Sequence, residues 1–342
     1  MIVNVVTEPD ELTTKDLIAQ ATVLTGCYQF TLDHLTDGAS FWLVGRDSAA
    51  DFRIAVSPQS SIRSRHAVFS FHAQSFAFSI RAAHKGVRHL SVNGGTVGRD
   101  SKGLLKNCLI TMGDLVFDYH YTPWAYSAIF DAEKTATIRR LVGDTVPPIM
   151  PPTPDPDALE IGQYVLAQHA GKGGSGTVSM GVSTGHKLVA IKNRYCRDTF
   201  AIERAKNQIP NMESLSKNSE NSEPKPRILQ LLEAKWQFNP DAQARPADSN
   251  MVYFVSHAYL SITLADLIKK GHKYTERTFV NILEAVASLH RQGWIHRDIK
   301  PANIGFTNDK DDWAVYSTST ILSECLRRPT LPNLGATAPY LT

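Results

Sequence analysis

The sequence of 342 residues is 42% hydrophobic and 20% charged, which is the composition of a soluble globular protein with a sizeable core. Its length allows two domains of ordinary size. A formal net charge of only +3 gives no reason to expect nucleic acid or a membrane surface as a partner.

Cysteine usage and the N-terminal residues indicate the compartment. The four cysteines, Cys27, Cys108, Cys196 and Cys325, show no Cys-x-x-Cys spacing, which favours a reducing environment and argues against a zinc site. Residues 1–12 are acidic without a basic flank, and no apolar run approaches the length of a membrane span. We therefore expect an intracellular protein, with nucleus and cytoplasm as open alternatives.

Residues 26–125 have the alternating pattern of half-buried β-strands. Apolar residues recur at every second position in three runs, which are Phe69 and Phe71, then Phe76, Phe78 and Ile80, then Leu115, Phe117, Tyr119 and Tyr121. Gly, Asp and Asn separate the runs as turn residues. The pattern predicts an all-β sandwich. Residues 1–25 are expected to be an N-terminal extension, with a short helical pattern at 12–24.

Four short motifs follow one another within this block, at residues 43–47 (LVGRD), 62–67 (IRSRHA), 92–94 (VNG) and 112–114 (MGD). In this order they resemble a forkhead-associated (FHA) domain, a β-sandwich whose loops bind phosphothreonine peptides. The resemblance implies that Arg46 binds phosphate, that Asn93 contacts the peptide and that His66 braces a loop. A phosphate needs a fixed cation with hydroxyl or amide donors, because charge-assisted hydrogen bonds carry most of the affinity. Phosphothreonine-containing proteins are therefore the expected partners.

The sequence departs from the FHA pattern at the phosphate-binding serine. That family places a serine three residues before the histidine, where this chain has Arg63, with Ser64 one place later. Either Arg63 pairs with the phosphate, or Ser64 substitutes from a shifted loop. The Asn93-Gly94 pair has a second interpretation as a hairpin turn. The sandwich as a whole also has a second interpretation, which is a docking module that does not recognise phosphopeptides.

A Pro-rich linker is expected over residues 126–157. The run at 147–156 (PPIMPPTPDP) is unable to form a helix interior or a strand ladder, so it predicts an extended, semi-rigid segment. The domain boundary is therefore expected near residue 150. A second domain then occupies residues 158–342.

The second domain opens with a glycine-rich turn and a strand lysine. After a short predicted strand come Gly171, Gly173 and Gly176 in a Gly-x-Gly-x-x-Gly pattern, with Val178 two residues beyond. Fourteen residues later, Lys192 ends the run Val-Ala-Ile-Lys. In this form and spacing, the two motifs resemble the nucleotide-binding segment of protein kinases. The resemblance implies ATP, with glycine amides over its phosphates and Lys192 holding the α- and β-phosphates.

In that family, the lysine pairs with a carboxylate of the next helix. Glu203 and Glu213 are the candidates, and spacing favours Glu213, although Pro210 interrupts the helical pattern just before it. Residues 214–226 are polar and low in complexity, which predicts a disordered loop. Residues 251–258 (MVYFVSHA) resemble the hinge strand, and residues 264–268 (LADLI) begin the first helix of the large lobe.

A predicted helix with apolar positions at Ile282, Val286 and Leu289 leads into residues 295–303 (IHRDIKPAN). This segment keeps the His, Arg, Asp and Asn of the kinase catalytic loop at the required spacing. The chain is accordingly identified here as resembling a eukaryotic-type protein kinase. The resemblance implies that Asp298 accepts the proton of the attacking hydroxyl and that Lys300, typical of the serine/threonine branch, faces the transferred phosphoryl group. It also implies that Asn303 binds Mg²⁺.

One element of the kinase pattern is missing. The family carries Asp-Phe-Gly about thirteen residues beyond the loop asparagine, and its aspartate binds the essential magnesium. Here that place falls on residues 316–318 (YST), after a predicted strand at 313–315, and no acidic residue occurs from 313 to 323. Residues 336–342 (ATAPYLT) resemble the segment before Pro-Glu, so we expect a truncated large lobe that leaves Leu289 and Ile295 exposed.

The two halves together resemble the checkpoint-kinase class, in which phosphothreonine binding recruits a serine/threonine kinase. The expected fold class is an all-β sandwich followed by an α+β kinase-like fold, as a small lobe and the start of a large one. The first interpretation is ATP- and Mg²⁺-dependent phosphoryl transfer to a Ser or Thr of a protein substrate. The second is a non-catalytic phosphopeptide-binding scaffold with a pseudokinase fragment. A third is that the sequence departs from the mature message beyond Asn303.

Overall fold

The computed structural model describes residues 2–5, 27–36, 39–54, 60–73, 75–142, 150–173, 176–220, 228–238, 250–257, 259–260, 262–271, 275–296, 298–306 and 314–316. The chain divides into two compact units, Met1–Lys192 and Asn193–Thr342. This division falls inside a strand, so the boundaries expected at residues 125 and 157 stay predictions.

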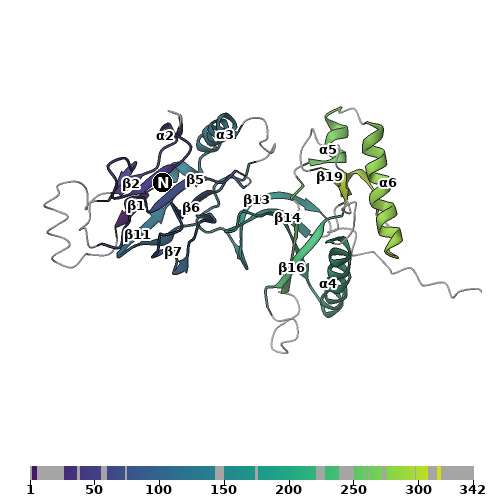
Figure 1. The fold of residues 1–342 in the computed structure, drawn as a ribbon. Coiled ribbons are helices and arrows are strands. Elements are labelled where there is room, and N and C mark those ends of the chain that lie inside the picture. Colours follow the sequence, from purple (N-terminus) through teal and green to yellow (C-terminus); the bar gives the residue numbers. More distant parts are fainter. Residues whose placement is uncertain are drawn as a thin grey trace, which may run out of the picture. The chain divides into compact units, whose positions relative to one another are not determined.

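The first unit begins with two β-sheets, called here the N-terminal sheet pair (Figure 1). One sheet has the order β2-β1-β11-β10-β7-β8 and the other β4-β3-β5-β6-β9. The strands of the first sheet are β1 (Ile2–Val5), β2 (Cys27–Gln29), β7 (Leu90–Val92), β8 (Gly95–Thr96), β10 (Cys108–Met112) and β11 (Leu115–His120). Those of the second are β3 (Trp42–Gly45), β4 (Phe52–Arg53), β5 (Ala67–Phe71), β6 (Phe78–Ala82) and β9 (Lys102–Gly103), and the short helix α2 (Asp33–Thr36) precedes β3.

The two sheets share one aromatic core, which confirms the alternating pattern in the sequence. Phe69 of β5, Phe78 of β6 and Phe117 of β11 are all buried in it. Phe78 stacks on Tyr119 of β11, the neighbouring sheet, with ring centroids 6.0 Å apart. Aromatic pairs of this kind add to the free energy gained by burying the rings.

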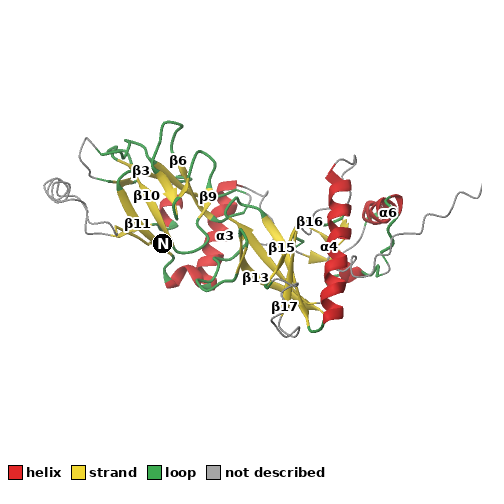
Figure 2. Ribbon diagram, turned by 90° about the horizontal axis from the view of Figure 1, so that it is seen from below, coloured by secondary structure: helices red, strands yellow, loops and turns green. Residues whose placement is uncertain are grey.

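The segments on either side of the sheet pair differ from the N-terminal extension expected at residues 1–25 and from the wholly extended linker expected at residues 126–157. Residues 2–5 are no extension, because β1 pairs with β11 and with β2; the helical pattern at 12–24 lies outside the described residues. The expected linker begins with the turn η1 (Pro123–Tyr126) and a 15-residue helix, α3 (Ala128–Val142), drawn in red in Figure 2. Of the Pro-rich run, Met150–Pro154 has neither helix nor strand, and Pro151 and Pro154 are buried.

A further sheet has the order β12-β13-β14-β15-β17-β16, and the division between the units falls within β15. In the first unit, β12 (Glu160–Ile161), β13 (Tyr164–Gly173) and β14 (Gly176–Ser183) form antiparallel pairs. The strand β15 (Leu188–Cys196) contains the predicted lysine. The predicted hinge strand is β17 (Asn250–His257), which pairs with β16 (Gln230–Trp236).

The second unit is built on helices. The helix α4 (Thr199–Glu220) runs through Pro210, so neither an interruption there nor a loop from residue 214 to 220 is present. The remaining elements are β18 (Ile262–Thr263), α5 (Leu264–Lys269), α6 (Glu276–Arg291), η4 (Pro301–Asn303), β19 (Ile304–Phe306) and β20 (Ala314–Tyr316). Thr263 caps α5 by accepting from the Asp266 amide, while the Asp266 carboxylate accepts from Thr263, so two backbone groups at the helix start are satisfied.

The helix α6 has one buried and one exposed apolar face. Leu289 is 0% exposed and packs in the core of the unit, so its expected exposure was wrong. Ile295, just after the helix, is exposed as expected, and on the helix itself Phe279 (61%) and Leu283 (66%) are exposed. Within the described residues, no helix is both long and apolar enough to span a bilayer.

Candidate catalytic loop, nucleotide hairpin and phosphate-binding loops

The glycine-rich segment lies at the tip of the β13–β14 hairpin. Gly173 pairs with Gly176 across the tip, and Gly171 pairs with Val178. A tip without side chains lets backbone amides approach a ligand closely. Lys192 lies on β15 with only 5% of its surface exposed. Lys192 is therefore held inside the fold, on the strand that follows the hairpin.

The structure shows which residues of α4 are buried. Glu213 and Glu203 are both exposed, and Glu203 pairs with Lys206 at 3.2 Å. The buried polar residue of the helix is Gln208, whose Oε1 accepts a hydrogen bond from Arg194 of β15 at 2.6 Å. Sequence reasoning passed over Gln208 because it searched for a carboxylate. The pairing of Lys192 with Glu213 stays a prediction.

The predicted catalytic loop is assembled. Lys300 Nζ lies 2.9 Å from Asp298 Oδ2, and Asn303 Nδ2 donates to the same oxygen at 2.9 Å and to the Asp298 carbonyl at 2.8 Å. The Asp298 amide donates to Nδ1 of the buried His296 at 3.0 Å. The hydrogen bond from Lys300, and after it that from Asn303, lowers the pKa of Asp298 below its usual value. The carboxylate therefore stays ionised and oriented at neutral pH.

The loop offers one neutral oxygen to a magnesium ion. The amide nitrogen of Asn303 donates to Asp298, and its Oδ1 accepts no hydrogen bond from the described residues. Mg²⁺ prefers oxygen ligands and usually takes at least one carboxylate. In the β19–β20 hairpin, Ile304 pairs with Tyr316, which is the first residue of the expected Asp-Phe-Gly place and is not acidic. Residues 317 and 318, the rest of that place, lie outside the described residues. The donor set around Asn303 thus fits a magnesium ion only in part.

Arg46, Arg63 and Ser64 lie together on neighbouring loops of the sheet pair. The Arg46 amide donates to the Arg63 carbonyl at 3.1 Å, and a Cβ on Gly45 would meet the Ser64 carbonyl oxygen at 2.1 Å, so only glycine fits before Arg46. Arg63 and Ser64 are exposed. The Nε of Arg46 is buried without a partner in the described part of the chain, a cost that an anion would remove.

His66 braces this loop from inside, as expected. Its Nδ1 accepts from the Arg63 amide at 3.1 Å. Burial lowers the pKa of His66 to about 4, and the charges of Arg63, His84 and His89 contribute in the same direction. Of these groups, Arg63 supplies a permanent positive charge at the loop edge. His84 and His89 belong to the loop between β6 and β7, which sequence reasoning missed because its residues match no short motif.

Asn93 does not lie with the other three residues. Its φ is +50° in the β7–β8 turn, and its Oδ1 accepts from the Leu109 amide at 2.9 Å, so the hairpin interpretation holds. The Arg63 loop instead reaches the opposite end of β10, where Ser60 donates to Asp114 at 2.8 Å. The two ends of β10 are about 13 Å apart. Asn93 is therefore removed from the candidate phosphate-binding set.

Residues 164–315, which are less than half of the chain, match the family model for the protein kinase domain. The chain is 30% identical over 159 residues to calcium-dependent protein kinase 13 of Arabidopsis thaliana. The aligned stretch covers 44% of this chain and 26% of that protein. The chain is also 29% identical over 167 residues to the probable serine/threonine-protein kinase PknB of Bifidobacterium longum, covering 44% and 21%. The chain thus spans about a quarter of the length of these relatives.

Proposed function

We propose that the chain is a serine/threonine protein kinase of limited catalytic power that recruits its protein substrates through phosphothreonine-containing partners. The convergence of Lys300 and Asn303 on one oxygen of Asp298 carries the kinase half of the proposal. This arrangement holds a proton acceptor, a cation and a metal ligand in one loop, which is what phosphoryl transfer requires.

One group of residues would bind the nucleotide, and another would act on the hydroxyl group of the substrate. Glycine amides at the hairpin tip and Lys192 bind the phosphates of ATP, and Mg²⁺ supplies neutralisation of the charge that develops on them. Asp298 orients the substrate hydroxyl and takes its proton, and Lys300 stabilises the transferred group. Asn303 holds Asp298 in place and presents Oδ1 to the metal ion.

Transfer by this chain is expected to be weak. The sequence has no acidic residue from 313 to 323, the segment in which the kinase resemblance expects a second, charged magnesium ligand. The loss of one preorganised electrostatic group typically costs about 10²–10³ in rate. The second candidate function, a phosphopeptide-binding scaffold, is favoured by this same observation.

Magnesium-dependent nucleotide binding tests the metal half of the proposal. Calorimetry of the full chain with ATP should show that Mg²⁺ tightens binding little in the wild type. It should tighten binding on the order of tenfold in Tyr316→Asp, because the carboxylate restores a ligand at the expected Asp-Phe-Gly place. Tyr316→Asn is the matched control without the charge. Equal Mg²⁺ dependence in all three proteins would contradict the proposal that the missing carboxylate limits magnesium binding.

The N-terminal sheet pair is proposed to be an FHA-like sandwich that binds phosphothreonine through Arg46, with Arg63 or Ser64 as the second donor. The unpartnered Nε of Arg46 and the exposed, permanently charged Arg63 support this. Arg46→Ala should weaken binding of a phosphothreonine peptide at least tenfold, since hydrogen bonds to charged groups are worth about 1.5–3 kcal/mol. Arg139→Ala, on the exposed face of α3, is the control. Equal affinity for the unphosphorylated peptide would count against the proposal.

A further inference from the structure

The β14–β15 turn of the kinase domain inserts a histidine into the N-terminal sheet pair. His186 is only 7% exposed and has a φ of +67°, a conformation that few residues other than glycine adopt. Its Nδ1 lies 3.0 Å from Ser75 Oγ and its Nε2 lies 2.9 Å from the Ser101 carbonyl oxygen. Its ring stacks on His72 with centroids 3.7 Å apart. All these partners belong to the sheet pair.

The hydrogen bonds define one tautomer of His186. A carbonyl oxygen only accepts, so Nε2 must carry the proton that it donates to Ser101, and Nδ1 accepts from the Ser75 hydroxyl. Burial, and then the neighbouring His72, lowers the pKa of His186 to about 4. The ring is therefore neutral at physiological pH, and both nitrogens are satisfied in the docked position.

Three other contacts join the sheet pair to the strands β12–β14 and the turn that follows them. The Gly103 amide of β9 donates to the Thr184 carbonyl at 2.8 Å. Lys106 pairs with Glu160 of β12 at 3.0 Å. Between them, Leu105 packs with Val165 and Val182 in a small apolar core. The joint thus combines hydrogen bonds, an ion pair and buried apolar surface.

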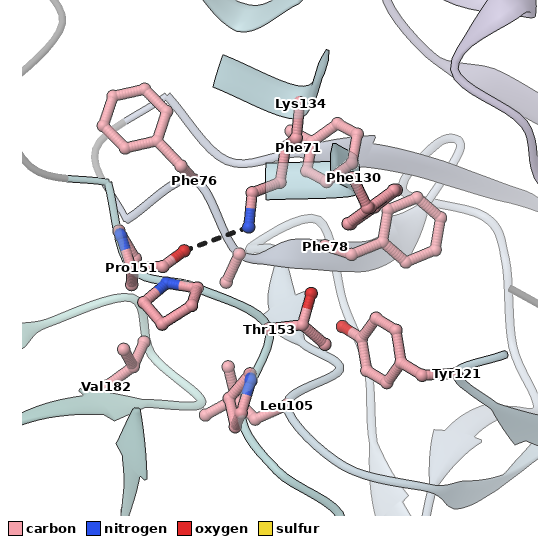
Figure 3. Close-up of a pocket in the computed structure, with 13 residues that line it drawn as sticks. Phe71, Phe76, Phe78, Leu105, Tyr121, Phe130, Lys134, Pro151, Thr153 and Val182 are labelled. Atoms are coloured by element: carbon pink, nitrogen blue, oxygen red, sulfur yellow. Dashed lines mark hydrogen bonds between the residues drawn. The ribbon is translucent and has the colours of Figure 1, made fainter. Parts of the chain in front are cut away.

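The Pro-rich segment closes the joint on one side. Lys134 of α3 is buried and donates to the Pro151 carbonyl at 3.0 Å, as Figure 3 shows. The small cavity there is lined by side chains of the sheet pair, by residues 151–154 and by Val182 of β14. The segment that joins the domains in sequence is therefore packed against the first of them.

We propose that the N-terminal sheet pair is an intramolecular brace for the glycine-rich hairpin, docked through His186, and not a module tethered by a free linker. The strand β14 connects the two features directly, because it has the glycine tip at Gly176 and the docked turn just after Ser183. Its eight residues span about 23 Å. The base of the hairpin is fixed to the sheet pair, so a shift of the sheet pair moves the tip that covers the nucleotide.

Amide hydrogen exchange in the full-length chain, without nucleotide or peptide, tests the brace. The Gly103 amide is protected by a bond across the joint, whereas the next amide, Leu104, bonds to Phe78 within the sheet pair. His186→Ala should accelerate exchange at Gly103 on the order of tenfold and leave Leu104 unchanged, because only the joint opens. Ser75→Ala, which removes a single hydrogen bond, should act in the same direction more weakly.

The control is Lys187→Ala, an exposed neighbour in the same turn, which should behave as the wild type. Unchanged Gly103 exchange in both His186→Ala and Ser75→Ala would overturn the proposal. So would equal acceleration of Gly103 and Leu104 in Ser75→Ala, because the substitution would then loosen the sheet pair itself. The test is independent of the proposed activity, since it involves no nucleotide.

Discussion

At the scale of single residues, the candidate kinase site depends on the partners of one carboxylate. Asp298 has Lys300 and Asn303 on the same oxygen, and both stabilise its ionised form. A carboxylate held in this way is already oriented, and it stays ionised over the whole physiological pH range.

Removing these partners should shift the pKa of Asp298 upward towards its usual value. Lys300 makes the larger contribution and Asn303 the smaller, so Lys300→Ala should raise the pKa more than Asn303→Ala. Carboxyl carbon NMR titration of Asp298 in the two variants measures the order directly. A larger rise in Asn303→Ala would reverse the account of this loop.

The two buried histidines predict how stability depends on pH. The pKa values of His66 and His186 are about 4 in the folded chain, against 6.5 for a histidine in the unfolded chain. Between these two pH values the unfolded chain binds more protons than the folded chain. The contribution of the two histidines to the free energy of unfolding is therefore fully present above pH 6.5 and falls as the pH approaches 4. Arg63, His84 and His89 lie around His66, and His72 lies against His186. None of these neighbours is a carboxylate, so no negative charge among them stabilises the protonated ring.

Urea unfolding of the full chain between pH 7 and pH 5 measures this loss. Each histidine contributes less than about 1.4 kcal/mol per pH unit. His66→Gln should make the dependence shallower, because one titrating group is gone. A free energy of unfolding that stays constant from pH 7 to pH 5 would contradict the burial of both rings.

Local spacing predicts site residues only where the chemistry is local. The roles of Asp298, Lys300 and Asn303 could be anticipated because all three lie within six residues of one loop. Asn93 was misplaced because the end of the sheet on which a turn lies depends on strand pairing. His186 gave no signal at all, since its partners Ser75 and Ser101 are more than eighty residues away.

At the scale of elements, α6 shows how one helix combines a structural and an uncovered face. Ala285 and Leu289 are buried in the core of the second unit, and Phe279 and Leu283 are exposed. A periodic apolar pattern identifies the helix but does not say which of two apolar faces is covered. Only the packing against neighbouring elements decides that.

Two substitutions of the same kind on α6 separate these faces. Leu289→Ala should lower the free energy of unfolding by about 2–5 kcal/mol, because it leaves a cavity in the core. Leu283→Ala should change it by less than about 0.5 kcal/mol. Denaturant unfolding compares the two, and a large loss in Leu283→Ala would mean that this face is covered in solution.

Helix boundaries were the least predictable part of the elements. The sequence around Pro210 indicates an interruption, yet α4 continues through it because Met212 and Leu215 beyond it are buried in the core. The helix α3 was hidden by the Pro-rich composition of the residues that follow. The strand runs of the sheet pair, in contrast, were predicted well, since their period of two is local.

At the scale of the whole molecule, the chain combines a protein kinase domain with an N-terminal β-rich region. The order of the kinase motifs predicted the elements that carry them, from the glycine hairpin to β20. The docking of the first three kinase strands on the sheet pair was not predictable, because a Pro-rich segment indicates separation when its packing partners are unknown.

The measurement that tests the account most directly is steady-state transfer of γ-phosphate from Mg-ATP to a serine/threonine protein substrate by the full chain. Asp298→Ala removes the proposed proton acceptor, and Asp157→Ala, an exposed aspartate, is its matched control. An assembled loop without the second magnesium ligand predicts residual transfer by the wild type and by Asp157→Ala, and none by Asp298→Ala. Sustained turnover by the wild type at the rate typical of kinases, about 1–100 s⁻¹, and lost in Asp298→Ala, would contradict the proposal that the missing magnesium carboxylate limits catalysis.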